Sequence, residues 1–433
     1  MNKLINVSLL LFSLLFFTQC NIYDSSEKKK ETLDPRLVEE GKRIFRYDTF
    51  GDEEFWSGVL HIDKAILGEE LGGYGPGVSP STALQVGLKV DSEALPAEIV
   101  AAVQAGEVDL NDPGTTLALL KLNAVVGIKG TFNDKGEMTQ IGITCAVCHS
   151  TVDDSFAPGI GKRLDGWPNR DLNVGAIISL TNNAEPIANL LHVDEATLRS
   201  VLSAWGPGKF NAGLMVDGIA LRPDGSVAAN LLPAAYGLTK DSYATYTGWG
   251  DVPYWNAFVA NIEMHGLGTF SDARLNNSTK YPIATENKFY DIKNENDLIS
   301  SKLPALLEYQ ISLETPVPPA GSYDEQAAER GEKIFNGKAE CLTCHSGPTY
   351  SDAENNLHTP EEIGIDSFEA DRSPTGMYRT TPLRGAWARA NGGYYHDGRF
   401  ETLDDVVNHY NDHFKLNLSN AEMKDLVHYL KSL

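Results

Sequence analysis

Cys145-Ala-Val-Cys148-His149 and Cys341-Leu-Thr-Cys344-His345 are the two stretches that decide the fold of this chain. In each stretch, two residues separate the cysteines, and a histidine directly follows the second cysteine. This is the attachment motif of c-type haem. One helical turn brings both thiols within reach of the two vinyl groups of a porphyrin, and the imidazole then falls under the iron as its proximal ligand. The sequence therefore predicts two covalently bound c-type haems, haem 1 at the first motif and haem 2 at the second.

Other sites built on paired cysteines fit this pattern less well. A four-cysteine zinc site would leave both histidines without a role. A redox-active disulfide would need a thioredoxin-like βαβ context, of which the sequence gives no sign. A disulfide closed across a two-residue gap would be strained. Covalent haem attachment accounts for all six residues of the two motifs.

Composition and charge exclude several classes of protein. The chain has 433 residues, of which 42% are hydrophobic and 22% are charged, as in a globular protein of about two or three domains. Its formal net charge is −23, which would repel a phosphate backbone, so we expect no nucleic-acid partner. The charge favours a positively charged protein partner, although a merely well-solvated acidic surface explains it equally well.

Residues 1–20 have the features of an export signal of the lipoprotein type. A positively charged start is followed by an apolar run that is too short to span a bilayer. The run ends at Cys20, whose acylation would anchor the protein, with residues 21–32 as a polar tether. Gln19 departs from the small residue that usually precedes a lipidated cysteine, so simple secretion is the alternative. We expect a protein of the periplasm or cell envelope that meets the membrane through this anchor only.

An internal echo predicts two haem-binding modules. Glu39–Phe45 (EEGKRIF) resembles Glu329–Phe335 (ERGEKIF). The second copy lies just before Cys341, as the first helix of a cytochrome c domain does, whereas the first copy lies far ahead of Cys145. One interpretation is that a long insertion separates the opening helix of the first module from its haem motif. Chance recurrence on two amphipathic helices is the alternative.

The expected fold class is therefore mainly α, with two cytochrome c-like haem domains, the first carrying a long insertion and loop-rich segments. The N-terminal domain is assigned to residues 33–314 and the C-terminal domain to residues 323–433, with a proline-rich linker over 315–322. The smaller expected elements are helices at 96–105, 113–122, 298–312, 323–335 and 421–433, a hairpin turn over 131–139 and a loop-dominated stretch over 206–250 that could wrap a haem face.

From residue 323 to its end, the chain resembles the bacterial dihaem cytochrome c peroxidases. This superfamily includes the dihaem enzyme that matures methylamine dehydrogenase. The matching pieces are Tyr378–Gly385, Tyr394–Phe400 and Thr402–Val407, and their order and spacing after the second haem motif are those of the family. The resemblance implies two haems with different roles and a calcium ion between the domains.

Two stretches of the N-terminal half resemble the same family more thinly. Ile160–Asn169 is similar to the loop that follows the family's first haem motif, and it contains Trp167, a candidate relay of electrons between the haems. Asn261–Met264 is similar to the stretch that carries the family's active-site glutamate. The resemblance thus implies that Glu263 is a catalytic acid or base, with His265 in reserve. An ordinary exposed helix residue is the alternative reading of Glu263.

The sixth ligand of each iron decides whether a haem carries electrons or binds a substrate. For haem 2 the candidates are Tyr410, which occupies the place where the family has Met or Tyr, and then Met377 and His409. For haem 1 we find no convincing strong ligand, so we expect an open position. The weaker candidates there are His192, Met215, Met264 and His265.

These expectations together describe a dihaem oxidoreductase that reduces hydrogen peroxide at haem 1. Splitting the O–O bond needs a nearby group to move a proton, and Glu263 is the first candidate. Electrons would enter through haem 2 from a small periplasmic cytochrome or cupredoxin. Two alternatives stay open: a dihaem electron-transfer protein without its own substrate, and an oxidase or oxygenase of a protein or organic substrate.

Overall fold

The computed structural model describes residues 32–433. The predicted export signal over 1–20, the acylation site at Cys20 and almost all of the tether over 21–32 lie outside the described residues. Leu33–Leu433 cluster as one unit. Every helix in this described part is too short or too polar to cross a lipid bilayer.

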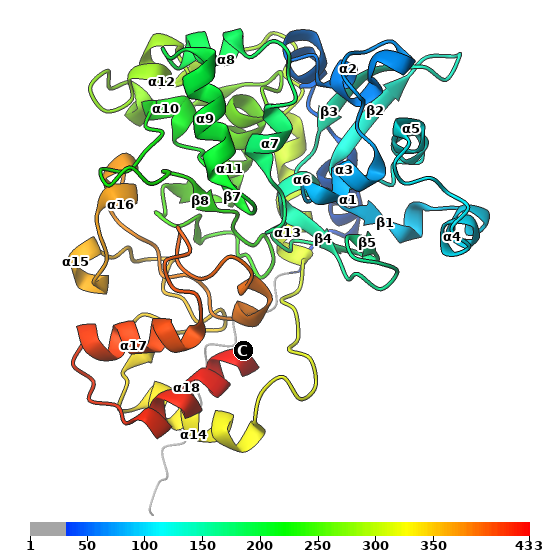
Figure 1. Ribbon diagram of the computed structural model, residues 1–433. Helices are drawn as coiled ribbons and strands as arrows, with labels where there is room; N and C mark the ends of the chain where they lie inside the picture. The colour runs from blue at the N-terminus through cyan, green and yellow to red at the C-terminus, as the bar shows by residue number, and fades with distance from the viewer. Residues whose placement is uncertain (1–31) are drawn as a thin grey trace, which may run out of the picture. The chain divides into compact units, whose positions relative to one another are not determined.

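Helices dominate the described part of the chain, which confirms that the fold is mainly α (Figure 1). The α-helices are α1 (Pro35–Tyr47), α2 (Ile62–Leu67), α3 (Pro80–Gln85), α4 (Ala97–Gln104), α5 (Pro113–Lys121), α6 (Ala146–His149), α7 (Val174–Ile178), α8 (Glu185–Leu190), α9 (Glu195–Trp205), α10 (Leu214–Asp217), α11 (Val252–Phe258), α12 (Pro282–Glu286), α13 (Leu303–Ser312), α14 (Glu325–Asn336), α15 (Pro360–Ile363), α16 (Phe368–Arg372), α17 (Leu403–His413) and α18 (Asn420–Ser432). Two π-helices span Glu54–Val59 and Val259–Glu263.

The strands form small two-stranded sheets and lie between the helices along the chain. One pair, β1 (Val90–Asp91) with β5 (Ile160–Gly161), is parallel. The antiparallel pairs are β2 (Ile128–Phe132) with β3 (Met138–Ile143), β4 (Ser150–Val152) with β6 (Arg163–Asp165), β7 (Lys209–Phe210) with β8 (Asn230–Leu231), β9 (Tyr243–Ala244) with β10 (Gly250–Asp251), and β11 (Phe270–Ser271) with β12 (Asp291–Ile292).

The elements expected from local sequence signals are confirmed. Helices α4 and α5 lie where they were predicted, and α5 has Pro113 in its first turn. The hairpin β2–β3 encloses the predicted turn. Helix α18 begins with a capping box, in which the Ser419 hydroxyl accepts a hydrogen bond from the Glu422 amide at 3.3 Å and the Glu422 carboxylate accepts one from the Ser419 amide at 2.7 Å.

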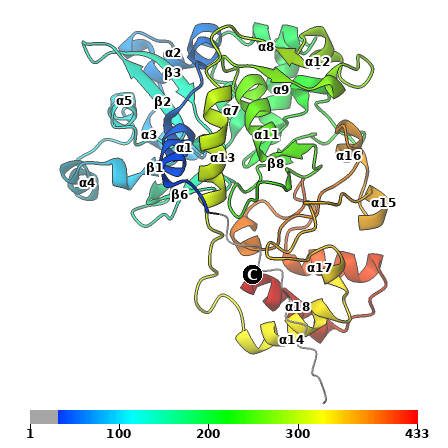
Figure 2. The same ribbon diagram turned by 180° about the vertical axis from the view of Figure 1, so that it is seen from behind.

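The two copies of the internal echo lie at two similar helix crossings. Helix α1 packs against α13 (Figure 2), and α14 packs against α18. A Cβ atom placed on Gly41 would lie 1.9 Å from the carbonyl oxygen of Ala305, and one placed on Gly331 would lie 2.1 Å from that of Asp425. The echoed glycine therefore lets the backbones of each helix pair approach closely.

An aromatic pair repeats beside each crossing. The ring centroids of Phe45 and Tyr309 are 5.4 Å apart at an interplanar angle of 62°, and those of Phe335 and Tyr429 are 5.2 Å apart at 64°. This agreement in register argues against chance recurrence of the echo. The division into two haem domains at residues 315–322 stays a prediction, which the likeness of the two crossings supports.

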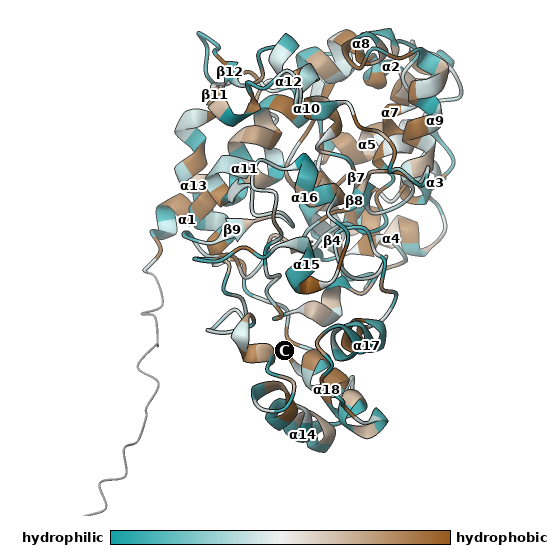
Figure 3. Ribbon diagram, turned by 90° about the vertical axis from the view of Figure 1, so that its left-hand side faces the viewer, coloured by the Kyte–Doolittle hydropathy of each residue, from teal (hydrophilic) through white to brown (hydrophobic). Residues whose placement is uncertain are grey.

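The buried apolar side chains form separate clusters along the chain. Two clusters draw their members from the first 314 residues, and one is built on α1 and α13. A third lies wholly after residue 334, with Phe335, Val407 and Leu426 among its members. Figure 3 shows hydrophobic and hydrophilic residues alternating along α14 and α18, as expected of helices that bury one face.

Candidate haem sites

The first motif forms one short helical turn, with Cys145 as the residue that precedes α6. Nδ1 of His149 lies 3.1 Å from the carbonyl oxygen of Pro233 and donates to it. Because Nδ1 carries the proton, the lone pair of Nε2 is free to bind a metal. Burial lowers the pKa of His149, which keeps the imidazole neutral.

The second motif has the same arrangement. A 3₁₀ turn spans Cys341–Thr343, and Nδ1 of His345 donates to the carbonyl oxygen of Tyr350 at 2.9 Å. Burial lowers the pKa of His345 as well. Both histidines are therefore neutral, oriented by a backbone carbonyl and able to present Nε2 to an iron.

The four motif cysteines are free thiols. Burial raises the pKa of Cys145, Cys148 and Cys341 to about 12, and it also raises the pKa of Cys344. The structure thus contains no disulfide within either motif. Paired free thiols followed by a histidine with an available Nε2 fit a covalently attached haem at both motifs.

A cavity of about 490 Å³ surrounds the second motif. Its walls include Cys341, Cys344, His345 and Tyr410. Residues of the N-terminal half also line it, among them Arg170, Pro233, Ala234, Tyr236, Gly237, Leu238 and Tyr246. The two thiols and the histidine therefore open into one shared cavity, as a haem requires, and both halves of the chain enclose it.

Of the three candidate ligands for haem 2, the structure brings only Tyr410 to this cavity. Burial raises the pKa of Tyr410 to about 12, and its ring lies 6.3 Å from that of Tyr395. Met377 is 36% exposed and lies outside the residues that line the cavity. His409 also lies outside them, and its Nε2 donates to the carbonyl oxygen of Ile363 at 3.0 Å.

Glu263 lies beside the first motif, at the end of the π-helix Val259–Glu263. Its Oε1 atom is buried and has no hydrogen-bond partner. Burial raises the pKa of Glu263 well above the usual range of a glutamate, which favours the protonated form of the carboxyl. The carboxyl is close enough to Cys148 to raise the pKa of that thiol. Glu263 is therefore a half-buried residue with a buried carboxyl oxygen beside the first motif, and the exposed-helix reading is wrong.

His265 lies two residues further along the chain, with a φ of 61°. Its ring stacks on Phe55, with centroids 3.7 Å apart, and burial lowers its pKa to about 4. The neighbouring Trp56 donates from Nε1 to the carbonyl oxygen of Met264 at 3.2 Å. The two π-helices thus meet beside the first motif, and π-helical turns are frequent at functional sites.

The remaining candidates for haem 1 have ordinary structural roles. His192 is exposed and pairs with Glu286 at 2.8 Å. Met215 and Met264 pack in apolar clusters, with 9% and 3% of their surface exposed. None of these three side chains has contacts that indicate an iron ligand.

The loop Gly166–Leu172 connects the two sites. The Gly166 amide donates to the carbonyl oxygen of His149 at 2.8 Å, and the Asn169 amide donates to that of Cys148 at 2.9 Å. Trp167 packs edge-on against Trp387 and Tyr236, with ring centroids 5.6 and 6.3 Å apart. Trp167 therefore lies between the first motif and an aromatic residue of the haem 2 cavity wall, where a relay would be placed.

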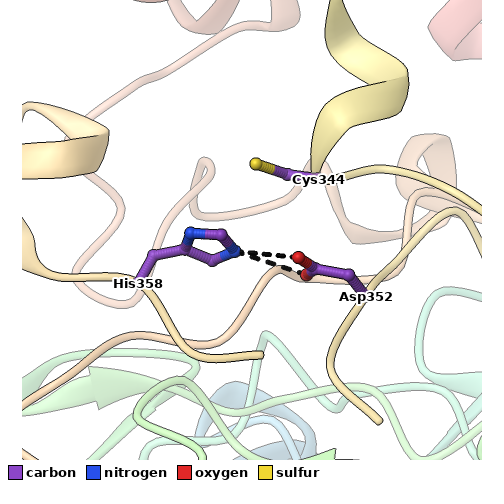
Figure 4. Close-up of side chains that lie close together, drawn as sticks. All are labelled: Cys344, Asp352 and His358. Atoms are coloured by element: carbon purple, nitrogen blue, oxygen red, sulfur yellow. Dashed lines mark hydrogen bonds and ion pairs between the residues drawn. The ribbon is translucent and has the colours of Figure 1, made fainter. Parts of the chain in front are cut away.

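One cluster of metal-ligating groups is present among the described residues, formed by Cys344, Asp352 and His358 (Figure 4). Nε2 of His358 lies 3.1 Å from Asp352 Oδ2, and its Nδ1 lies 3.1 Å from Glu362 Oε1. Cys344 already belongs to the haem motif, and calcium prefers a set of oxygen ligands. This cluster is therefore part of the haem 2 surroundings, and the calcium ion between the domains stays a prediction.

Sequence reasoning missed the arginines of the haem 2 cavity. Arg170, Arg379, Arg384 and Arg389 all line it. The signal was present, because Arg170 directly follows the stretch Ile160–Asn169 that resembles the family, and Arg379 and Arg384 lie inside Tyr378–Gly385. These four arginines come together in one cavity only through tertiary packing, which their spacing in the sequence does not reveal.

No protein-family model matches this sequence, but curated proteins do. The gamma subunit of hydrazine synthase from Kuenenia stuttgartiensis is 31% identical over 172 residues, covering 30% of this chain and 49% of that protein. The cytochrome-c peroxidase IdrP1 from Denitromonas iodatirespirans is 32% identical over 151 residues, covering 24% and 40%. The methylamine utilization protein MauG from Methylorubrum extorquens is 30% identical over 156 residues, covering 31% and 43%. The matches span less than half the length of each of these relatives.

Proposed function

Because this chain resembles the dihaem cytochrome c peroxidases and MauG, we propose that it is a dihaem oxidoreductase that reduces hydrogen peroxide at haem 1 with electrons entering through haem 2. The observation that carries the proposal is the buried Glu263 carboxyl beside the first motif, whose Oε1 atom has no partner. A protonated acid with a free oxygen is what peroxide cleavage needs from the protein.

Haem 1, when bound through Cys145 and Cys148, would supply an iron that can bind peroxide and exchange electrons. His149 would bind that iron through Nε2, since its Nδ1 donates a hydrogen bond to the carbonyl oxygen of Pro233. Glu263 would deliver its proton to the departing oxygen of the peroxide, which leaves as water. Over the whole reaction, one peroxide, two electrons and two protons give two molecules of water.

Contacts of the two residues that follow Glu263 support this role by fixing the chain at this point. The ring of His265 is stacked on Phe55 and neutral, and Trp56 is fixed to the backbone of Met264. A dry surrounding keeps the pKa of Glu263 high and makes the proton transfer specific. The alternative acid, His265, would have to ionise in the same buried surrounding.

For haem 2, we propose Tyr410 as the sixth ligand. Low-temperature electron paramagnetic resonance of the ferric protein counts the spin states and reports the ligands. Tyr410→Phe should change the signal of haem 2 only, and Met377→Ala should leave both signals unchanged. A change in the Met377→Ala protein would instead favour that methionine.

The electron donor is proposed to be a small, basic cytochrome or cupredoxin of the periplasm. The net charge of −23 would steer such a partner toward this protein. The rate of haem reduction by the donor should then fall as ionic strength rises. Acylation at Cys20 would anchor this protein to a membrane facing that compartment, and labelling with a radioactive fatty acid tests it.

Stopped-flow mixing with peroxide, with and without a reduced cytochrome, tests the function. We expect peroxide to be consumed only while reduced cytochrome is present. Two six-coordinate low-spin haems without peroxide turnover would instead indicate an electron-transfer protein. Peroxide consumption that depends on an added organic or protein substrate would indicate an oxidase or oxygenase.

A further inference from the structure

Two arginines of the haem 2 cavity carry a buried nitrogen without a partner. The Nε atoms of Arg170 and Arg379 are both buried and make no hydrogen bond. Arg170 is only 8% exposed. Leaving a buried guanidinium donor unpaired is costly, so such groups are almost always matched by an anion.

The described residues supply no such anion. The ion pairs of the described chain include neither arginine, and the groups that influence the pKa of Arg170 and Arg379 are tyrosines and Arg389, not carboxylates. Burial lowers the pKa of Arg170, and it lowers the pKa of Arg379 to about 10. Both side chains are therefore cationic at neutral pH and bring two positive charges to the cavity.

Each arginine is also held in place from one end. Nη1 of Arg170 donates to the carbonyl oxygen of Asn391 at 3.2 Å, and Nη1 of Arg379 donates to that of Tyr243 at 2.7 Å. These bonds fix the guanidinium planes and leave Nε free. A fixed guanidinium with free donors is suited to bind a carboxylate through two parallel hydrogen bonds.

We propose that Arg170 and Arg379 bind the propionate groups of haem 2. A haem carries two carboxylates, and the cavity that contains Cys341, Cys344 and His345 also contains these two unpartnered cations. This inference rests on haem attachment at the second motif, which is part of the proposed function, and not on peroxide reduction.

Arg170 has a consequence that Arg379 does not share, because it belongs to the loop Gly166–Leu172. The same loop binds the carbonyl oxygens of Cys148 and His149. Arg170 is therefore a positioning residue that joins the haem 2 propionates to the backbone of the first motif. The ferric haem carries one more positive charge than the ferrous haem. The positive charge of Arg170 therefore destabilises the ferric state and raises the reduction potential of haem 2.

The experiment measures the reduction potential of each haem in the holoprotein by optical spectroelectrochemistry. In Arg170→Gln, we expect the ratio of oxidised to reduced haem 2 at a fixed potential to rise about tenfold, equivalent to a fall of about 59 mV for one electron. Haem 1 should stay within error of the wild type. Arg170→Lys keeps the charge but not the paired donors, so its potential should lie between the two.

Arg199→Gln is the matched control. Arg199 donates through Nη1 to the carbonyl oxygen of Ser179 at 3.0 Å and lies outside the cavity, so its loss removes the same charge without touching haem 2. Arg379→Gln provides a second variant if Arg170→Gln folds poorly, and it should lower the potential of haem 2 in the same direction.

Two results would overturn the inference. One is an unchanged haem 2 potential in both Arg170→Gln and Arg379→Gln, and the other is an equal shift at both haems. A wild-type protein whose mass lacks the second haem would overturn the proposed function and this site together. A dihaem protein without peroxide turnover would overturn only the peroxidase proposal, and the potentials would still decide the role of the arginines.

Discussion

At Cys145–His149 and at Cys341–His345, the histidine donates from Nδ1 to a backbone carbonyl oxygen, at 3.1 Å and 2.9 Å. The surroundings then differ. The first site has the buried acid Glu263, whereas the second has the phenol of Tyr410 together with four arginines. The comparison teaches that the same hydrogen bond to the motif histidine can stand in two different surroundings, which a few side chains set apart.

The largest expected effect comes from removing the thiols of one site at a time. Serine cannot form a thioether, so Cys145→Ser/Cys148→Ser and Cys341→Ser/Cys344→Ser should each lack one covalent haem by mass spectrometry. Loss of haem 1 should abolish peroxide turnover. Loss of haem 2 should leave peroxide binding at haem 1 intact while stopping electron delivery from a cytochrome.

The assignment of roles would be reversed if the variant without haem 2 lost peroxide binding and the variant without haem 1 kept it. Retention of both haems in either variant would contradict covalent attachment through these cysteines.

The next effect concerns the acid that only the first site has. Glu263→Gln removes the proton carrier with little change in size, so peroxide turnover should fall about 10²- to 10⁴-fold. The high pKa of Glu263 should also place a limb of the pH–rate profile above the usual range of a glutamate, and this limb should disappear in the variant. Steady-state rates with a reduced cytochrome measure both.

Glu286→Gln is the control for this experiment, because Glu286 is an exposed residue that pairs with His192. It should turn over peroxide at the wild-type rate. A Glu263→Gln protein with the wild-type rate and pH profile would show that the proton is moved by another group.

A smaller effect tests the likeness of the two halves. Gly41→Ala and Gly331→Ala would each place a Cβ within about 2 Å of a carbonyl oxygen of the facing helix, so each should lower the free energy of unfolding by about 1–3 kcal/mol. Thermal unfolding followed by circular dichroism measures this. Gly58→Ala is the control, since a Cβ there would meet nothing within 4 Å. Destabilisation by only one of the two substitutions would show that the two helix crossings are not equivalent.

A pH dependence of the stability should come from Asp52, a second buried acid of the first half. Asp52 is fully buried, and burial raises its pKa to about 9. The folded chain therefore keeps a proton that the unfolded chain loses near pH 4, so stability should fall from about pH 4 to about pH 9, by at most about 1.4 kcal/mol per pH unit. Asp52→Asn should flatten this slope in chemical denaturation. An unchanged slope would show that Asp52 ionises normally.

Local signals in the sequence were sufficient for much of the fold. The haem motifs, the proline that opens α5 and the capping box of α18 all act within a few residues, so each could be predicted from spacing. The place of Glu263 was indicated by a four-residue resemblance alone. Its high pKa comes from burial, which spacing does not reveal.

Contacts between distant parts of the chain were beyond prediction. Arg170 and Arg379 reach one cavity only after the N-terminal half folds onto the second motif. The stacking of His265 on Phe55 and the exposure of Met377 likewise depend on packing between segments far apart in sequence. Residue type and order identify the candidate site residues, and only the folded structure shows which of them lie together.

The acceptors for His149 and His345 are main-chain oxygens, of Pro233 and Tyr350. Every amino acid brings such an oxygen, so exchanging either side chain need not remove the acceptor. A neutral amide also draws the imidazole proton less strongly than a carboxylate would, which leaves the iron with an ordinary imidazole donor. The basicity of both proximal nitrogens is thus insulated from mutation at these two positions, and evolution can retune the rest of each pocket without disturbing it.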